Sequence, residues 1–183
     1  MSRHHHKPSW MDATRWAAPD DADPANAPAT APTDAPATAP TDADPLAGMP
    51  FFASLRPADR RALGACGTLR SYAAGATLVE EGQRPDVGLF IVMRGSVRIT
   101  QLSVSDGVRP LALLGPGEMF GELALLDGEP RSATAMAITP TLAFVTPIFD
   151  IRPLLRRNPE IAIALLGQMS RRIRAAEAWL TLP

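Results

Sequence analysis

The hydrophobic pattern changes its period twice along the chain, and the middle part is β-like. Between Leu69 and Thr146, short runs of β-branched and apolar residues are separated by glycine, proline and aspartate. Asp106-Gly107 is the strongest hairpin signal among these breaks. Many short strands at this spacing predict an antiparallel barrel or a jelly-roll-like sandwich. The expected strands are residues 69–72, 77–79, 89–93, 97–104, 110–114, 133–138 and 142–146.

Helical patterns flank this region on both sides. Residues 50–55 and 59–63 predict short helices, and Pro57 can open the second. Residues 148–155 predict another, and Asn158-Pro159-Glu160 then combines an N-cap residue, a proline at the first position and an acid in the first turn of a long helix. An apolar stripe at helical spacing follows: Ala162, Leu165, Leu166, Met169, Ile173, Ala176 and Leu180. The fold class is therefore mainly β with flanking α.

The first 45 residues have a different composition. An eight-residue segment at 27–34 recurs at 35–42, and prolines stand every fourth position from Pro24 to Pro40. We expect residues 1–45 to be a disordered Ala/Pro/Thr/Asp-rich tail and linker, and residues 46–183 to fold. The triplet from His4 to His6, with nearby Trp10 and Trp16, suits a docking peptide, a weak metal site or a plain tail. Three adjacent imidazoles without a scaffold make no selective metal site, so none is predicted.

Charge and composition exclude several classes of protein. From residue 46 onward there are 15 basic and 12 acidic residues. This small excess of positive charge disfavours a nucleic-acid binder, which usually has a strongly basic face. No apolar run is long enough to span a membrane, and the basic N-terminus leads into no secretory signal. The single Cys66 cannot form an internal disulfide. We expect a cytoplasmic protein that does not associate with membranes.

The segment from Gly117 to Thr134 fits neither a strand nor a simple turn. Gly121 can let the backbone approach a ligand, and residues 122–125 can form a short helix whose free N–H groups face an anion. Arg131 offers a forked donor set that matches phosphate oxygens. Ser132 adds a hydroxyl, and Glu122 is an acceptor suited to a ribose hydroxyl. This combination favours a ligand that carries both an anion and hydroxyl groups.

These residues resemble the phosphate-binding cassette of cyclic-nucleotide-binding domains, as in catabolite activator-type regulators, protein kinase A regulatory subunits and gated channels. The match lies in residues 120–125 and 130–134, and the likeness extends from about residue 46 to 177. The nine-residue interval from Glu122 to Arg131 is similar to the kinase-subunit form. The resemblance implies a double-stranded β-helix, or jelly-roll-like β-roll, followed by a long C-terminal helix.

The resemblance also implies roles for individual residues. Glu122 would accept from the ribose 2′-hydroxyl, Arg131 would pair with the cyclic phosphate, and Ser132 would contact phosphate or base. The base would meet the final helix. The expected ligand is a cyclic nucleotide, with cyclic AMP favoured over cyclic GMP, and no other cofactor. Backbone amides of residues 121–124 would complete the phosphate cradle. On the final helix, Arg171, Arg174 or Trp179 could cap the base.

The expected ligand-binding residues are therefore Gly121, Glu122, Leu123, Ala124, Arg131 and Ser132.

Several interpretations of the whole chain stay open. It could be a regulatory module that reports ligand occupancy through its C-terminal helix to an effector or a second copy. It could be a truncated catabolite activator or Fnr-type regulator, for which direct DNA binding is not expected because no recognition helix follows. It could be a degenerate domain in which Glu122 and Arg131 form a mutual salt bridge. We expect no enzyme and no catalytic residue, because no nucleophile and base are paired beside Glu122 and Arg131.

Overall fold

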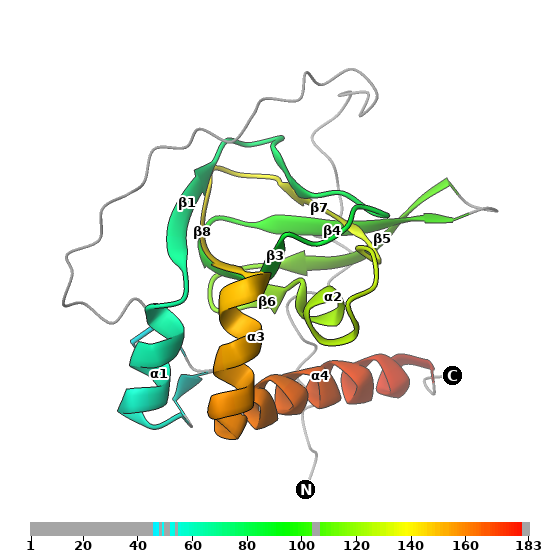
Figure 1. The fold of residues 1–183 in the computed structure, drawn as a ribbon. Helices are drawn as coiled ribbons and strands as arrows, with labels where there is room; N and C mark the ends of the chain where they lie inside the picture. The colour runs from blue at the N-terminus through cyan, green and yellow to red at the C-terminus, as the bar shows by residue number, and fades with distance from the viewer. Residues whose placement is uncertain (1–45, 48, 50–51, 54, 104–106, 181–183) are drawn as a thin grey trace, which may run out of the picture.

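The computed structural model describes residues 46–47, 49, 52–53, 55–103 and 107–180. Two four-stranded antiparallel sheets form a β-roll, and the helices gather at one end of it (Figure 1). The sheets have the strand orders β1-β8-β3-β6 and β2-β7-β4-β5. The elements are α1 (Pro57–Gly64), β1 (Thr68–Tyr72), β2 (Thr77–Val79), β3 (Val87–Arg94), β4 (Val97–Ser103), β5 (Gly107–Leu114), β6 (Met119–Phe120), α2 (Glu122–Asp127), β7 (Thr134–Ala137), β8 (Thr141–Pro147), α3 (Ile148–Arg157) and α4 (Pro159–Leu180).

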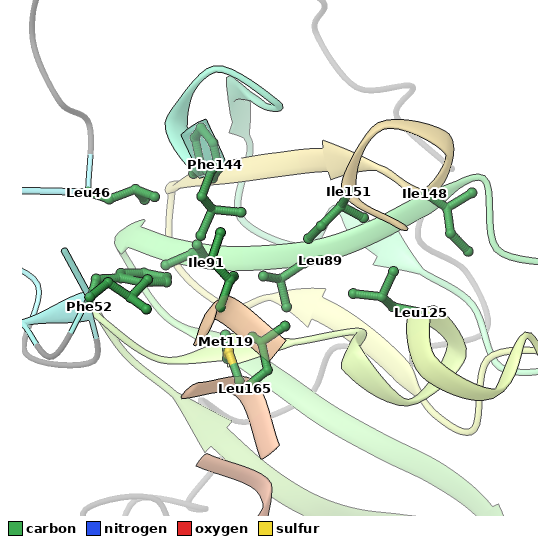
Figure 2. Close-up of a cluster of buried hydrophobic side chains, with 13 residues drawn as sticks. Leu46, Phe52, Leu89, Ile91, Met119, Leu125, Phe144, Ile148, Ile151 and Leu165 are labelled. Carbon is green, nitrogen blue, oxygen red and sulfur yellow. The ribbon is translucent and has the colours of Figure 1, made fainter. Parts of the chain in front are cut away.

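Strand β3 separates two hydrophobic clusters because its side chains alternate between the faces of its sheet. Leu89 and Ile91 point toward the helices, where Phe144, Ile151 and Leu165 meet them (Figure 2). Phe90 and Val92 point into the space between the sheets, together with Phe120. Each buried side chain of this size contributes about 1.5–3 kcal/mol relative to exposure. The first cluster therefore fixes α3 and α4 against the roll, and the second holds the two sheets together.

The hairpin predicted at Asp106-Gly107 joins β4 to β5, in antiparallel register with Ser103 opposite Gly107. Gly107 has a φ of 70°, the left-handed conformation that glycine adopts without strain. Residues 104–106 at the tip lie outside the described part. Pro110 sits where the register shifts between Ile99 and Thr100, an irregularity at which a residue without an N–H is tolerated.

The predicted fold class is confirmed, and the differences are local. The helix expected at 50–55 lies partly outside the described residues; within them Phe52 belongs to a 3₁₀ turn, with Phe52 N donating to Met49 O and Leu55 N to Phe52 O. The two-residue strand β6 was not predicted. The predicted start of the long helix is confirmed, since α4 begins at Pro159 directly after Asn158, and Ile161 N donates to Asn158 O at 3.0 Å. The side chain of Asn158 bonds to α3 instead, since its Nδ2 donates to Leu154 O, as does its backbone N–H.

The predicted tail of residues 1–45, including His4–His6, Trp10 and Trp16, lies outside the described residues. None of the helices that the structure describes is long and apolar enough to cross a membrane.

Candidate functional site

A cavity of about 490 Å³ lies between the second sheet, α2 and α4. All six predicted ligand-binding residues line it. The remaining wall comes mostly from the second sheet and from α4, together with Phe120 of β6 and Ala133, which precedes β7. Its other members are Val79, Ile99, Leu111, Ala112, Leu114, Phe120, Ala133, Ala135, Arg172 and Ile173.

Arg131 is fixed in the cavity wall from several directions. Gly82 N donates to Arg131 O at 2.8 Å, and Arg131 N donates to Gln83 O at 2.9 Å, so the loop after β2 holds its backbone. Its Nη1 donates to Gly121 O at 3.2 Å, and its Nη2 donates to Val87 O. The residue is only 5% exposed. The guanidinium is therefore positioned by the protein itself.

Burial gives this guanidinium an unusual electrostatic environment. Desolvation lowers the pKa of Arg131 below its ordinary value, and the carboxylates of Asp86 and Glu122 act in the opposite direction. A cation in such a place stays charged, because an arginine pKa remains far above neutral pH. A buried cation with few carboxylates around it is well suited to receive an anion.

Gly121 makes room for the arginine. Its φ of 86° is left-handed, and it precedes α2 as the N-cap. A Cβ at this position would lie 2.9 Å from Arg131 Nη1 and 3.1 Å from Gly88 O. Any side chain here would push against the guanidinium, which is the physical reason for glycine at the start of the cassette.

Glu122 stands on the same wall but has a different partner. It is 7% exposed, and its Oε1 accepts from Nη1 of Arg172 at 2.9 Å. The Nη2 of Arg172 donates to Met119 O. Arg172 thereby joins α4 to the segment that carries Glu122. The alternative of a mutual salt bridge between Glu122 and Arg131 is not what the structure has, since the guanidinium of Arg131 donates to two carbonyl oxygens and Glu122 pairs with Arg172.

Neither arginine that the sequence offered on the long helix lines the cavity. Arg171 is exposed and bonds to Gln168 Oε1 of its own helix, and Arg174 is exposed as well. Arg172 lines the cavity instead. It follows the buried Leu165 by seven residues, about two turns, so both lie on one helix face. The spacing singles out Arg172 only once the structure shows that Leu165 is the buried residue of the stripe. The side chain of Trp179 lies outside the described part.

The far wall is apolar. Val79, Ile99 and Ala135 belong to it, while the exposed Ser132 lies at the rim near the arginine. The cavity is thus polar at the end of Arg131, Glu122 and Arg172 and apolar at the other. It suits a ligand with an anionic group and hydroxyls on one side and a flat, weakly polar ring on the other.

The chemical groups of the cavity wall are few in kind. Among its described residues, Ser132 is the only hydroxyl side chain, and none is a histidine, lysine or cysteine. Within the described ranges, no group of three His, Cys, Asp or Glu side chains could hold a metal ion.

Comparisons with known proteins place the chain in a family. Residues 69–158 match the family model described as "Cyclic nucleotide-binding domain". The chain is 36% identical over 139 residues to the cyclic AMP receptor protein of Thermus thermophilus, covering 75% of this chain and 63% of that protein.

Solved structures show the same fold. The Thermus thermophilus catabolite activator protein matches with a TM-score of 0.63 and 36% identity, over 72% of this chain and 61% of that one. The N-terminal domain of a transcriptional regulator from Streptomyces coelicolor matches with a TM-score of 0.58 and 36% identity, over 73% of this chain and 95% of that one. The chain thus spans less than two thirds of each Thermus thermophilus match and nearly all of the Streptomyces domain. It belongs to the cyclic nucleotide-binding domain family.

Proposed function

We propose that this cavity binds a cyclic nucleotide, with cyclic AMP as the preferred ligand. The observation that carries the proposal is the buried guanidinium of Arg131, held in place by Gly121 O and Val87 O. These two bonds occupy two of its five N–H donors, which leaves donors for the oxygens of a cyclic phosphodiester. Because this cation is already desolvated and fixed, binding an anion costs little further ordering.

The other parts of the ligand find matching partners in the same cavity. The carboxylate of Glu122 would accept from the ribose 2′-hydroxyl, and backbone N–H groups between Gly121 and Ala124 would complete the phosphate cradle. Val79, Ile99 and Leu111 would pack against the base. Ser132 at the rim would reach the phosphate or the base.

Cyclic AMP is favoured over cyclic GMP for two reasons. The relative from Thermus thermophilus is named a cyclic AMP receptor protein. The base end of the cavity is lined by apolar side chains, so it places few hydrogen-bonding groups around the additional polar atoms of guanine.

We further propose that ligand occupancy is reported through α4 to a second copy or an effector protein. Arg172 of α4 bonds to the carboxylate that would hold the sugar, so the ligand and α4 share Glu122. A ligand can shift α4 only by as much as its affinities for the two positions differ. Two exposed apolar side chains on α4, those of Ile163 and Leu166, offer a surface for such a partner.

A regulatory role without catalysis fits the relatives, whose names describe a receptor, an activator and a transcriptional regulator. Incubation of the protein with cyclic AMP should therefore leave the nucleotide intact. Release of 5′-AMP at a rate that depends on Arg131 would contradict this part of the proposal.

A thermal-shift panel tests the binding proposal. At a ligand concentration 100-fold above Kd, a bound ligand stabilises the native state by about 2.7 kcal/mol, which raises Tm by on the order of 10 °C. We expect the largest shift with cyclic AMP, a smaller one with cyclic GMP, and little with adenosine, which lacks the phosphate, or with cyclic di-GMP. Equal shifts with adenosine and cyclic AMP would show that the arginine end does not bind the phosphate.

Hydrogen exchange tests the role of α4. Addition of cyclic AMP should change the exchange of the α4 amides around Arg172 as well as those of α2. Protection confined to α2 and the strands would show that the ligand binds without affecting α4, which would contradict signalling through this helix.

A further inference from the structure

Arg131 lies over a pair of stacked aromatic rings. The rings of Phe90 and Phe120 are 4.7 Å apart between centroids and inclined by 8°. The guanidinium carbon of Arg131 lies 5.8 Å from the centroid of the Phe90 ring. Phe90 is 1% exposed and Phe120 is 5% exposed, so both rings are fixed by the core between the sheets.

The ring face supplies a contact that the hydrogen bonds do not. The carbonyl oxygens of Gly121 and Val87 attract the edge of the guanidinium, where its N–H groups point. The face of an aromatic ring carries partial negative charge and attracts a cation placed above it. In a desolvated site this attraction is stronger than at an exposed one. Ring and carbonyl oxygens together limit both the position and the tilt of the guanidinium.

The same two rings connect the arginine to the cassette. Phe90 and Phe120 are direct cross-strand partners where β3 pairs with β6. Strand β6 has only two residues and runs directly into Gly121 and α2. Such cross-strand aromatic pairs help to fix the register of short strands. The stack therefore lies at the junction of the strand that bears Phe90 and the turn that bears Gly121.

We propose that Phe90, backed by Phe120, is a positioning residue that holds the guanidinium of Arg131 in its anion-binding orientation before any ligand enters. The proposal rests on the proposed function for the identity of the ligand. Its claim about the orientation of the guanidinium is independent of the ligand, because the rings, the guanidinium and the two carbonyl oxygens all belong to this chain.

Nuclear magnetic resonance of the arginine side chains tests this claim without ligand. The Arg131 resonances, assigned by their loss in Arg131→Lys, should show hindered rotation of the guanidinium. Phe90→Met keeps an apolar side chain of similar length but removes the ring face. The guanidinium should then rotate faster, and its separate resonances should merge into averaged ones. Phe144→Met is the matched control, since Phe144 is equally buried but belongs to the other hydrophobic cluster. Unchanged hindered rotation in Phe90→Met would overturn the proposal.

Calorimetry with cyclic AMP measures the consequence for binding. Phe90→Met should weaken affinity about 3- to 30-fold, whereas Phe144→Met should lower Tm and leave affinity unchanged. In an Arg131→Ala background, Phe90→Met should cause no further loss, because its effect passes through the guanidinium. Equal losses of affinity from Phe90→Met in the wild-type and Arg131→Ala proteins would show that Phe90 acts only on the fold, which would overturn its positioning role.

A fluorinated ring separates charge attraction from packing. Para-fluoro and 3,4,5-trifluorophenylalanine at position 90 keep nearly the shape of the ring while reducing the negative charge of its face. A stepwise loss of affinity with fluorine content supports the proposal, and a constant affinity overturns it. If the wild-type protein binds no cyclic nucleotide while the hindered rotation still depends on Phe90, the proposed function fails and the positioning role of Phe90 stands.

Discussion

Arg172 of α4 and Glu122 of α2 form a hydrogen-bonded ion pair of 2.9 Å, and they do so across 50 residues of sequence. The carboxylate side chain is 9% exposed and the guanidinium side chain 28%. The same guanidinium also reaches Met119 O at the end of β6. One arginine therefore connects the long C-terminal helix to the strand and the helix that frame the cavity.

Removal of Arg172 should loosen α4. In Arg172→Ala the buried carboxylate of Glu122 loses its cation partner, which should cost about 1–3 kcal/mol of stability. Urea denaturation measures this loss, and hydrogen exchange should show faster exchange in the α4 amides. Arg171→Ala is the control, because Arg171 bonds to Gln168 on the exposed side of its own helix. Equal stability of the two variants would show that the ion pair does not hold α4.

The sugar end of the site is tested by Glu122→Gln. This change keeps the shape of the side chain but removes its charge, so a hydrogen bond from the ribose 2′-hydroxyl should weaken. Hydrogen bonds to charged groups contribute about 1.5–3 kcal/mol, equivalent to roughly 10- to 150-fold in affinity. Wild-type protein should prefer cyclic AMP over its 2′-deoxy analogue by a factor in that range, and the variant should lose most of this preference. A preference that persists in Glu122→Gln would assign the 2′-hydroxyl to another partner.

A methyl group at Gly121 should disturb the arginine directly. The substitution Gly121→Ala forces a side chain into a left-handed backbone and places its Cβ 2.9 Å from Arg131 Nη1. The matched control is Gly117→Ala, with a φ of 84° and nothing within 4 Å of the added Cβ. Both variants should lose roughly 1–2 kcal/mol of stability from the backbone conformation. Only Gly121→Ala should also weaken cyclic AMP binding in a titration; equal affinities would show that the guanidinium has room to move.

The thiol of Cys66 should make the stability of the fold depend on pH in the alkaline range. Burial raises the pKa of Cys66, and the carboxylate of Asp150 adds to the shift. The folded protein therefore keeps this proton to higher pH than the unfolded chain, so stability should decline as pH rises above the ordinary thiol pKa. Denaturation midpoints between pH 7.5 and 10 should fall less steeply in Cys66→Ala. Identical slopes would mean that the thiol titrates alike in both states.

The positions of the strands were predictable because their signals are local. Turn residues such as Gly107 and the alternation along β4 depend on neighbours in the sequence, and the structure places β1, β2 and β4 within a residue or two of the prediction. Pro57 opens α1 as expected. The short strand β6 gave no such signal, because two residues cannot show a period. It exists through its pairing with Phe90 and Ile91 of β3.

The cavity was predictable on its cassette side and not on its helix side. Gly121, Glu122 and Arg131 lie within eleven residues of one another, so their convergence needs only a turn and a short helix. Whether Arg172, Arg171 or Arg174 lines the cavity depends on the rotation of α4 about its own axis. The packing of Ile161 and Leu165 in the core sets this rotation. Similarly, the ring stack beneath Arg131 depends on the register between β3 and β6. Sequence patterns fix neither relationship.

The central claim is that Arg131 receives the phosphate of a cyclic nucleotide, and isothermal titration of cyclic AMP into wild-type protein and Arg131→Ala tests it most directly. Loss of the guanidinium leaves a buried phosphate without its cation, which should cost roughly 2–5 kcal/mol. Affinity should fall about 30-fold to several thousand-fold, while circular dichroism shows that the β-roll persists. Equal affinities of the two proteins for cyclic AMP would contradict the account.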